Sequence, residues 1–221
     1  MLKTISHNVF EINYSNTYNM TNKNEILYQY KNGNIQVTFF TDGTKTIEYE
    51  ENPFPYFPES VNIKIAEYCN VKHEFIYADL NKLRAILISL PAGVELNIEG
   101  DATLKHPDLI DFLVWCQSRG LICNLIVKYF CSKEYFTTLE TLVEENLVID
   151  VILPINENFV CINNLTNLKT AQYDYTKDNS IFSMYIDAVN QEYAPTSVSD
   201  DRKSFKDLSL YEYFINYKNL E

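Results

Sequence analysis

The sequence predicts an α/β fold, either a partial (β/α) barrel or an open parallel sheet, preceded by an antiparallel β-meander and followed by C-terminal helices. Strand-like apolar segments begin near residues 61, 94, 121 and 147 and alternate with helix-like segments. This spacing is typical of parallel strands joined by right-handed crossovers. The meander is predicted by two turn sequences, Lys31–Asn34 and Thr41–Thr44, each built around Asn-Gly or Asp-Gly. Periodicity alone does not choose between a barrel and an open sheet.

Four regions follow from this pattern. Residues 1–51 form an Asn-rich arm and the meander, whose strands are expected within residues 26–49. Residues 52–58 form a linker, because three prolines in seven residues disfavour regular structure. Residues 59–158 form the β/α core. Residues 159–221 form an extension of strands and helices that packs on the core.

The core strands are predicted from two sequence patterns, alternation and continuous apolar runs. Residues 61–65 and 94–98 alternate apolar and polar side chains, as half-buried strands do. Residues 121–127 and 147–153 are nearly continuous apolar runs, which is typical of strands buried on both faces.

The bounds of the core helices are predicted from residues that favour helix starts and ends. Asp79 can cap the first helix, and Pro107 stands at a position favoured at the start of the second. Gly120 ends the second helix as a left-handed cap. A third helix is expected from Ser132 to about Asn146.

The regular alternation of strand-like and helix-like segments stops after Pro154. Residues 159–162 and 169–175 are expected to be strands. Residues 181–193 are expected to form a helix, because Ile181, Met184, Tyr185 and Ala188 share one helical face. A polar segment follows at 195–204, and a final helix is expected over 208–215.

Composition limits the function classes. The chain has 221 residues, 18 Lys plus Arg and 30 Asp plus Glu, and a formal net charge of −12. Direct nucleic-acid binding is disfavoured, because phosphate neutralisation needs basic residues. A partner with a basic protein surface is favoured electrostatically. The five glycines form no phosphate-binding fingerprint, and no hydrolase or zinc-protease motif is present.

The expected location is the cytoplasm, or the host cytoplasm if the chain is viral. The five cysteines are odd in number and loosely spaced, which is typical of reduced thiols and not of a disulfide framework. No signal peptide opens the chain and no apolar run reaches membrane-spanning length, so no membrane association is expected.

Three segments between residues 35 and 155 carry a family resemblance. A strand runs into Cys69, which is followed by His73 and Ile76 at the spacing Cys-x3-His-x2-Ile. The next strand ends in Glu99-Gly100-Asp101-Ala102, and His106-Pro107-Asp108-Leu109 opens the following helix. These segments resemble phage-encoded radical S-adenosylmethionine proteins, in which the first motif is Cys-x3-Cys-x2-Cys and the second is Gly-Gly-Glu-Pro.

The resemblance implies a degenerate site. In the family, three cysteines bind an iron–sulfur cluster and the second motif holds the amino group of S-adenosylmethionine. Here Ile76 has no lone pair for iron, and Glu99 adds bulk and charge where the backbone approaches the ligand. We therefore expect a pseudoenzyme with no catalytic residues, no metal and no cofactor, in which Cys69, His73, Ile76, Glu99, Gly100, Asp101 and Ala102 are vestigial positions.

A protein that keeps a fold but has lost its catalytic site is expected to act through binding at its surface. With the acidic charge and the phage resemblance, we expect a protein-binding inhibitor of the anti-CRISPR or another anti-defence type. Its partner would be a host defence protein or ribonucleoprotein complex with a basic surface. Two alternatives stay open: a radical S-adenosylmethionine enzyme whose cluster a partner completes, and a sponge for a small molecule or nucleotide. The candidate partner-binding residues are Glu48, Glu50, Glu51, Glu144, Glu145, Asp200 and Asp201.

Overall fold

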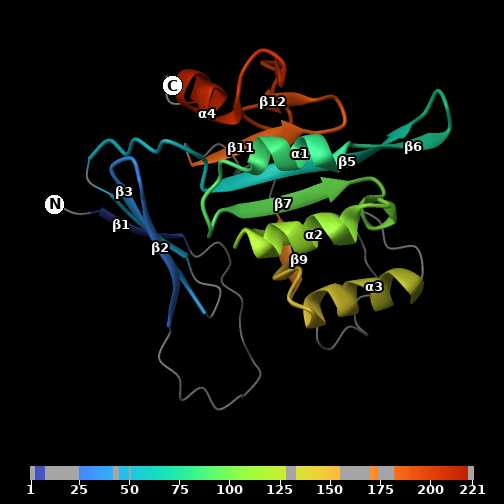
Figure 1. Cartoon of the computed structure of the whole chain (residues 1–221), viewed down its shortest axis with the longest axis horizontal. Helices are drawn as coiled ribbons and strands as arrows, with labels where there is room; N and C mark the ends of the chain where they lie inside the picture. Colours follow the sequence, from blue (N-terminus) through green and yellow to red (C-terminus); the bar gives the residue numbers. More distant parts are fainter. Residues whose placement is uncertain are drawn as a thin grey trace. The chain divides into compact units, whose positions relative to one another are not determined.

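The computed structural model describes residues 3–7, 25–41, 45–49, 51–127, 133–154, 170–173 and 182–218. The chain divides into two compact units, Met1–Tyr56 and Phe57–Glu221. The predicted α/β class is confirmed: the first unit holds an antiparallel sheet, and the second holds a mostly parallel sheet with helices (Figure 1).

The first unit is the predicted meander with one additional strand. Its sheet order is β1-β4-β3-β2 and every neighbouring pair is antiparallel. Gly33 lies in the turn between β2 and β3 with φ 64°, a conformation that glycine adopts without strain. Asn34 Oδ1 accepts from the Phe54 amide at 2.6 Å, so part of the predicted linker is hydrogen-bonded to this turn. The strands are β1 (Lys3–His7), β2 (Ile26–Asn32), β3 (Ile35–Phe40) and β4 (Lys45–Tyr49).

The second unit is built on a nine-stranded sheet. Its order is β10-β9-β8-β7-β5-β11-β12-β13, and β6 pairs with β5. Neighbours from β10 to β11 are parallel, whereas the pairs that include β6, β12 or β13 are antiparallel. The described strands form an open sheet and not a closed barrel. They are β5 (Ser60–Cys69), β6 (Glu74–Tyr77), β7 (Glu95–Gly100), β8 (Ile122–Ile126), β9 (Asp150–Pro154), β10 (Thr170–Tyr173), β11 (Ser183–Asp187), β12 (Glu192–Ala194) and β13 (Lys203–Ser204).

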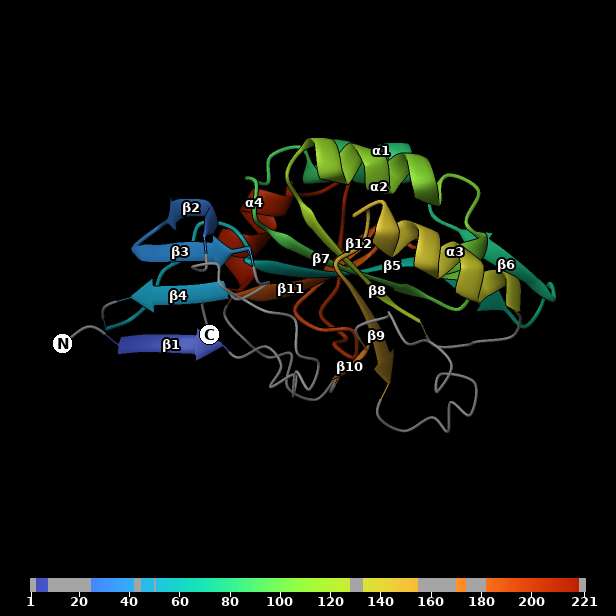
Figure 2. The same ribbon diagram turned by 90° about the horizontal axis from the view of Figure 1, so that it is seen from below.

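The helices of the core begin and end close to the predicted positions. Asp79 Oδ1 caps α1 by accepting from the amides of Asn81 and Lys82. Gly120 follows α2 with φ 70°, as predicted for a left-handed cap. Figure 2 shows all three core helices on one face of the sheet. The helices are α1 (Leu80–Leu87), α2 (Leu109–Ser118), α3 (Lys133–Glu144), α4 (Leu210–Tyr213), the 3₁₀ turn η1 (Thr103–Lys105) and the π-helical turn η4 (Phe214–Lys218).

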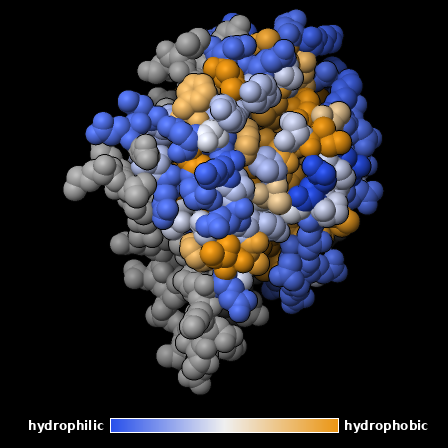
Figure 3. Space-filling model, turned by 60° about the vertical axis from the view of Figure 1, so that its left-hand side comes forward, coloured by the Kyte–Doolittle hydropathy of each residue, from blue (hydrophilic) through white to orange (hydrophobic). Residues whose placement is uncertain are grey.

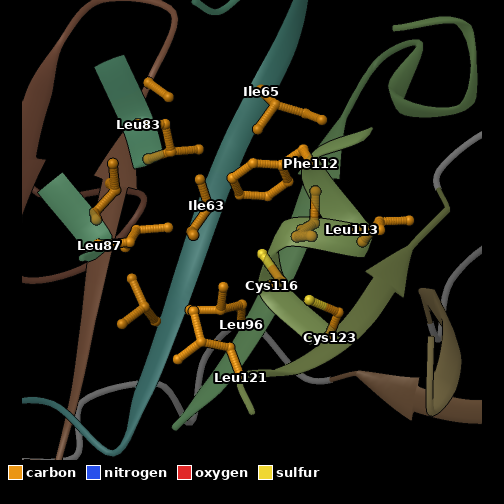
Figure 4. Packing of buried hydrophobic residues seen from close by; sticks show 14 of the residues in the cluster. Ile63, Ile65, Leu83, Leu87, Leu96, Phe112, Leu113, Cys116, Leu121 and Cys123 are labelled. Carbon is orange, nitrogen blue, oxygen red and sulfur yellow. The ribbon is translucent and has the colours of Figure 1, made fainter. Parts of the chain in front are cut away.

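The apolar core lies between these helices and the sheet. Ile63 of β5 lies among Leu83 of α1 and Phe112 of α2 in Figure 4, and all three are fully buried. Alternation along β5 and β7 sends Val61, Ile63, Leu96 and Ile98 into this core. The opposite face of the same strands therefore carries their remaining, mostly polar, side chains.

The prediction of a helix over residues 181–193 is wrong. Ser183–Asp187 is strand β11, which pairs in parallel with β5, and Glu192–Ala194 is strand β12. A short apolar run does not distinguish helix from strand, and here pairing with β5 decides the structure. The expected strand at 159–162 lies outside the described residues, and that at 169–175 contains β10.

None of the helices in the described part of the chain has the length and hydrophobicity that a bilayer crossing requires.

Candidate functional site

The segment Cys69–Ile76 forms a β-hairpin. Strand β5 ends at Cys69, a turn covers Asn70–His73, and β6 returns antiparallel with Cys69 opposite Glu74 and Glu67 opposite Ile76. His73 lies in the turn with φ 53°, and its Nδ1 is 3.5 Å from the Tyr68 hydroxyl. The three motif positions are therefore spread along an extended two-stranded ribbon.

The second motif fastens the end of β7 to β5. A Cβ on Gly100 would lie 2.7 Å from the Ala66 carbonyl oxygen, so only glycine fits this approach. The Asp101 amide donates to that same oxygen at 3.2 Å, and Asp101 Oδ2 accepts from the Tyr68 amide at 2.8 Å. Gly100 and Asp101 thus hold the end of β7 against β5 through backbone contacts and one side-chain hydrogen bond, while Ala102 precedes the turn η1.

Glu99 lies in a different environment from its neighbours. Its side chain is on the sheet face opposite the helices and only 2% of the residue is exposed. The Tyr185 hydroxyl hydrogen-bonds to the Glu99 carboxylate. Burial raises the pKa of Tyr185 strongly, and the negative charges of Glu99 and Asp187 raise it further, so this phenol is a donor.

Lys64 forms ion pairs with two carboxylates of the second unit, those of Asp187 and Glu67. Asp187, Lys64 and Glu99 are register partners on β11, β5 and β7. Lys64 Nζ lies 2.8 Å from Asp187 Oδ2 and 2.9 Å from Glu67 Oε2. Burial acts to lower the pKa of Lys64, but the bonds to Asp187 and Glu67 outweigh it and the pKa is raised. The lysine is therefore held charged between the strands.

Asp187 is the centre of a second group of contacts, made by residues that follow β11. The Asn190 backbone amide donates to Oδ1 at 3.0 Å, the Asn190 side chain donates to Oδ2 at 2.9 Å, and Arg202 lies 3.6 Å from Oδ2. Burial acts to raise the pKa of Asp187, yet the bonds to Lys64 and Asn190 lower it. Its carboxylate stays charged although the side chain is only 3% exposed.

A polar row crosses the middle of the same face. We use this name for Tyr185, Asn62, Asn97, Asn124 and Asp150, which are successive register partners on β11, β5, β7, β8 and β9. Asn124 Nδ2 donates to Asn97 Oδ1 at 3.0 Å, and Asn97 Nδ2 donates to Asn62 Oδ1 at 2.9 Å. A parallel sheet normally buries apolar side chains on both faces, so this row is a departure that invites a functional explanation.

Sequence reasoning missed the polar row, although a signal exists. The centre of three strands reads Val-Asn-Ile, Leu-Asn-Ile and Cys-Asn-Leu. Asparagine is depleted in strands, so its recurrence between apolar residues in consecutive strands is informative. Only the register, however, shows that the three amides touch.

His106 and the described core thiols have structural roles. His106 Nε2 lies 2.9 Å from the Ala78 carbonyl oxygen and Nδ1 accepts from the Asp108 amide at 3.1 Å, which fixes a neutral ring. Burial lowers the pKa of His106, consistent with that state. Cys123 shares a hydrogen bond with Cys116 inside the core, and this bond, with burial, raises the pKa of Cys123 well above its usual value.

The acidic partner-binding candidates lie in several places. Glu48 on β4 and Glu51 are exposed in the first unit, and Glu50 lies outside the described residues. In the second unit, Glu144 and Glu145 end α3, whereas Asp200 and Asp201 lie between β12 and β13. Figure 1 shows α3 and β12 in well separated parts of the second unit. Asp201 is also paired with Lys203 at 3.0 Å.

Comparisons with known proteins give one structural likeness. The crystal structure of Streptococcus suis SuiB bound to S-adenosylmethionine superposes with a TM-score of 0.39 at 10% identity, over 74% of this chain and 65% of the SuiB chain. No protein-family model and no curated protein matches the sequence. Among the residues that the structure describes, no three His, Cys, Asp or Glu side chains are grouped so as to hold a metal ion.

Proposed function

We propose that this chain is a catalytically inactive protein that acts by binding another protein, as an inhibitor of a host defence complex of the anti-CRISPR type. The observation that carries the proposal is the β5–β6 hairpin, which occupies the segment where the resemblance would place cluster ligands. Its residue Val71 is 92% exposed, and Tyr68, Phe75 and Ile76 also present large apolar side chains to solvent.

The hairpin has the composition of a binding surface. Figure 1 shows it projecting beyond the end of β7. Aromatic residues are enriched where proteins recognise one another, and a group of exposed apolar side chains on a projecting element is uncommon without a partner. Tyr68 and Phe75 support each other through an edge-to-face contact at 5.2 Å, which limits the entropy that binding must remove.

The net charge of −12 supports the choice of a basic partner. Complementary charge steers association and selects partners, while apolar contacts supply most of the affinity. Figure 3 shows one face of the molecule, on which hydrophobic patches are separated by hydrophilic residues. A chain with this net negative charge and exposed apolar anchors on its hairpin fits a protein groove that normally receives nucleic acid.

The test uses purified guide-RNA nuclease complexes and a target-cleavage assay. The chain should inhibit at least one complex, and inhibition should weaken as salt rises from 50 to 500 mM, about a threefold drop in Debye length. Val71→Asp should abolish inhibition, whereas the matched Ile110→Asp, on the exposed side of α2, should not. Equal inhibition by both variants would contradict the role of the hairpin.

The absence of catalysis has a separate test. After anaerobic incubation with iron and sulfide, the purified protein should stay colourless. A brown protein with charge-transfer absorbance would instead favour an enzyme and overturn this part of the proposal.

A further inference from the structure

One acceptor in the polar row has no hydrogen-bond partner among the residues that the structure describes. This acceptor is Oδ1 of Asn124, a residue that is only 8% exposed. Leaving a buried acceptor unpaired is unfavourable, because the oxygen loses its hydrogen bonds to water and gains none in the protein. Such an atom in an otherwise bonded network is a position where a ligand can supply the missing donor.

The orientation of the amides is fixed by their neighbours. Asn97 Nδ2 donates to both Ser60 Oγ and Asn62 Oδ1, so Asn97 Oδ1 must accept from Asn124. Turning the Asn124 amide over would set two oxygens against each other. The donors of the row therefore point towards β5, and its open acceptor lies at the β8 end.

The charges around this acceptor define the ligand. Asp150 is the register partner of Asn124 on β9, so its carboxylate is on the same face, one strand away. Glu99 and Asp187 are in the adjoining row, where Lys64 carries the positive charge between them. An anion brought to the β8 end of the row would meet an amide oxygen and a carboxylate.

We propose that the polar row binds a small organic cation that carries N–H donors, a guanidinium or primary ammonium group, with Asn124 Oδ1 and Asp150 as its acceptors. The planar guanidinium fork can donate to both acceptors at once. Bare Ca²⁺ or Mg²⁺ fits less well, because each requires about six oxygen ligands.

The experiment follows the side-chain amide signals of the polar row by NMR. Methylguanidinium is titrated into the whole chain at millimolar concentrations, with neutral methylurea as the matched probe. The expected result is saturable shifts at Asn97 and Asn124, with methylguanidinium binding at least about tenfold more tightly than methylurea, as a charged hydrogen bond implies. Shifts that are linear in concentration, or equal affinity for both probes, would overturn the proposal.

Two variants connect the binding to these residues. Asn124→Ala should weaken methylguanidinium at least about tenfold. Asn81→Ala, on α1 at the opposite face of the sheet, should bind like the parent chain. If Asn124→Ala does not fold, Asp150→Asn carries the test, since Asp150 is only half-buried. Unchanged affinity in Asp150→Asn would show that the cation does not bind at this row.

Discussion

The side chains of Asn97 and Asn124 are joined by a 3.0 Å hydrogen bond between neighbouring parallel strands. Asn97 also donates to Ser60 and to Asn62, which makes it the central amide of the polar row.

The first prediction concerns this central position. Asn97→Leu should destabilise the chain by about 2–4 kcal/mol, because it leaves the buried amide groups of Asn62 and Asn124 without their Asn97 partner. Urea unfolding followed by circular dichroism measures the change. Asn81→Leu, at an exposed position of α1, is the control and should stay within about 0.5 kcal/mol of the parent. Equal midpoints for the two variants would mean that the row adds nothing to stability.

The second prediction concerns pH. The folded pKa of Asp187 is lowered, so its contribution to stability is fully present above its unfolded value near 3.8 and is lost as pH falls through the lower folded pKa. Asp187→Asn should cost about 3 kcal/mol at pH 7, because Lys64 loses its buried partner.

Denaturation midpoints measured from pH 2 to pH 7 check this. The difference between parent and Asp187→Asn should shrink as the solution is acidified below pH 4. A difference that stays constant across that range would show that the Asp187 carboxylate is not the stabilising form.

The third prediction concerns the close approach of β7 to β5. Gly100→Ala should destabilise by about 2–4 kcal/mol, since the new Cβ would overlap the Ala66 backbone and φ is +153°. Thermal unfolding gives the comparison, with Ser118→Ala at an exposed position of α2 as control. A variant as stable as the parent would mean that the two strands can separate slightly at no cost.

The fourth prediction concerns thiol reactivity. Cys69 is half-buried at a strand end, whereas Cys116 and Cys123 lie inside the core. Because burial and the shared hydrogen bond raise the pKa of Cys123, its thiolate is scarce as well as covered. Iodoacetamide labelling at pH 8, mapped by peptide mass spectrometry, should modify Cys69 at least about a hundredfold faster than Cys123. Similar rates would indicate that the core opens readily.

Local pattern predicted much of this fold. Strands β5 and β7 followed from alternation, β8 and β9 from apolar runs, and the cap of α1 from Asp79. Strand β11 was missed because Met184, Tyr185 and Ala188 also suit a helical face, and its state is decided by β5, far away in the sequence.

Of the two candidate sites, the sequence pointed to one and not to the other. The hairpin occupies a segment that sequence had already singled out at Cys69, His73 and Ile76, although its ribbon geometry was not predicted. The polar row was not foreseen, since each asparagine alone is only an unfavourable residue in a strand. The hydrogen bonds between them exist because three strands share one register, which is a property of the assembled sheet.

The place of β11 beside β5 has a consequence for synthesis. As the chain leaves the ribosome, β7 follows β5 closely and can join one side of it. On the other side β6 pairs only with residues 66–69, so residues 60–64 have to wait for residues 183–187, which are made much later. Until then this part of β5 has an unpaired edge, so nascent chains stalled before that point should be the ones that chaperones hold and proteases remove.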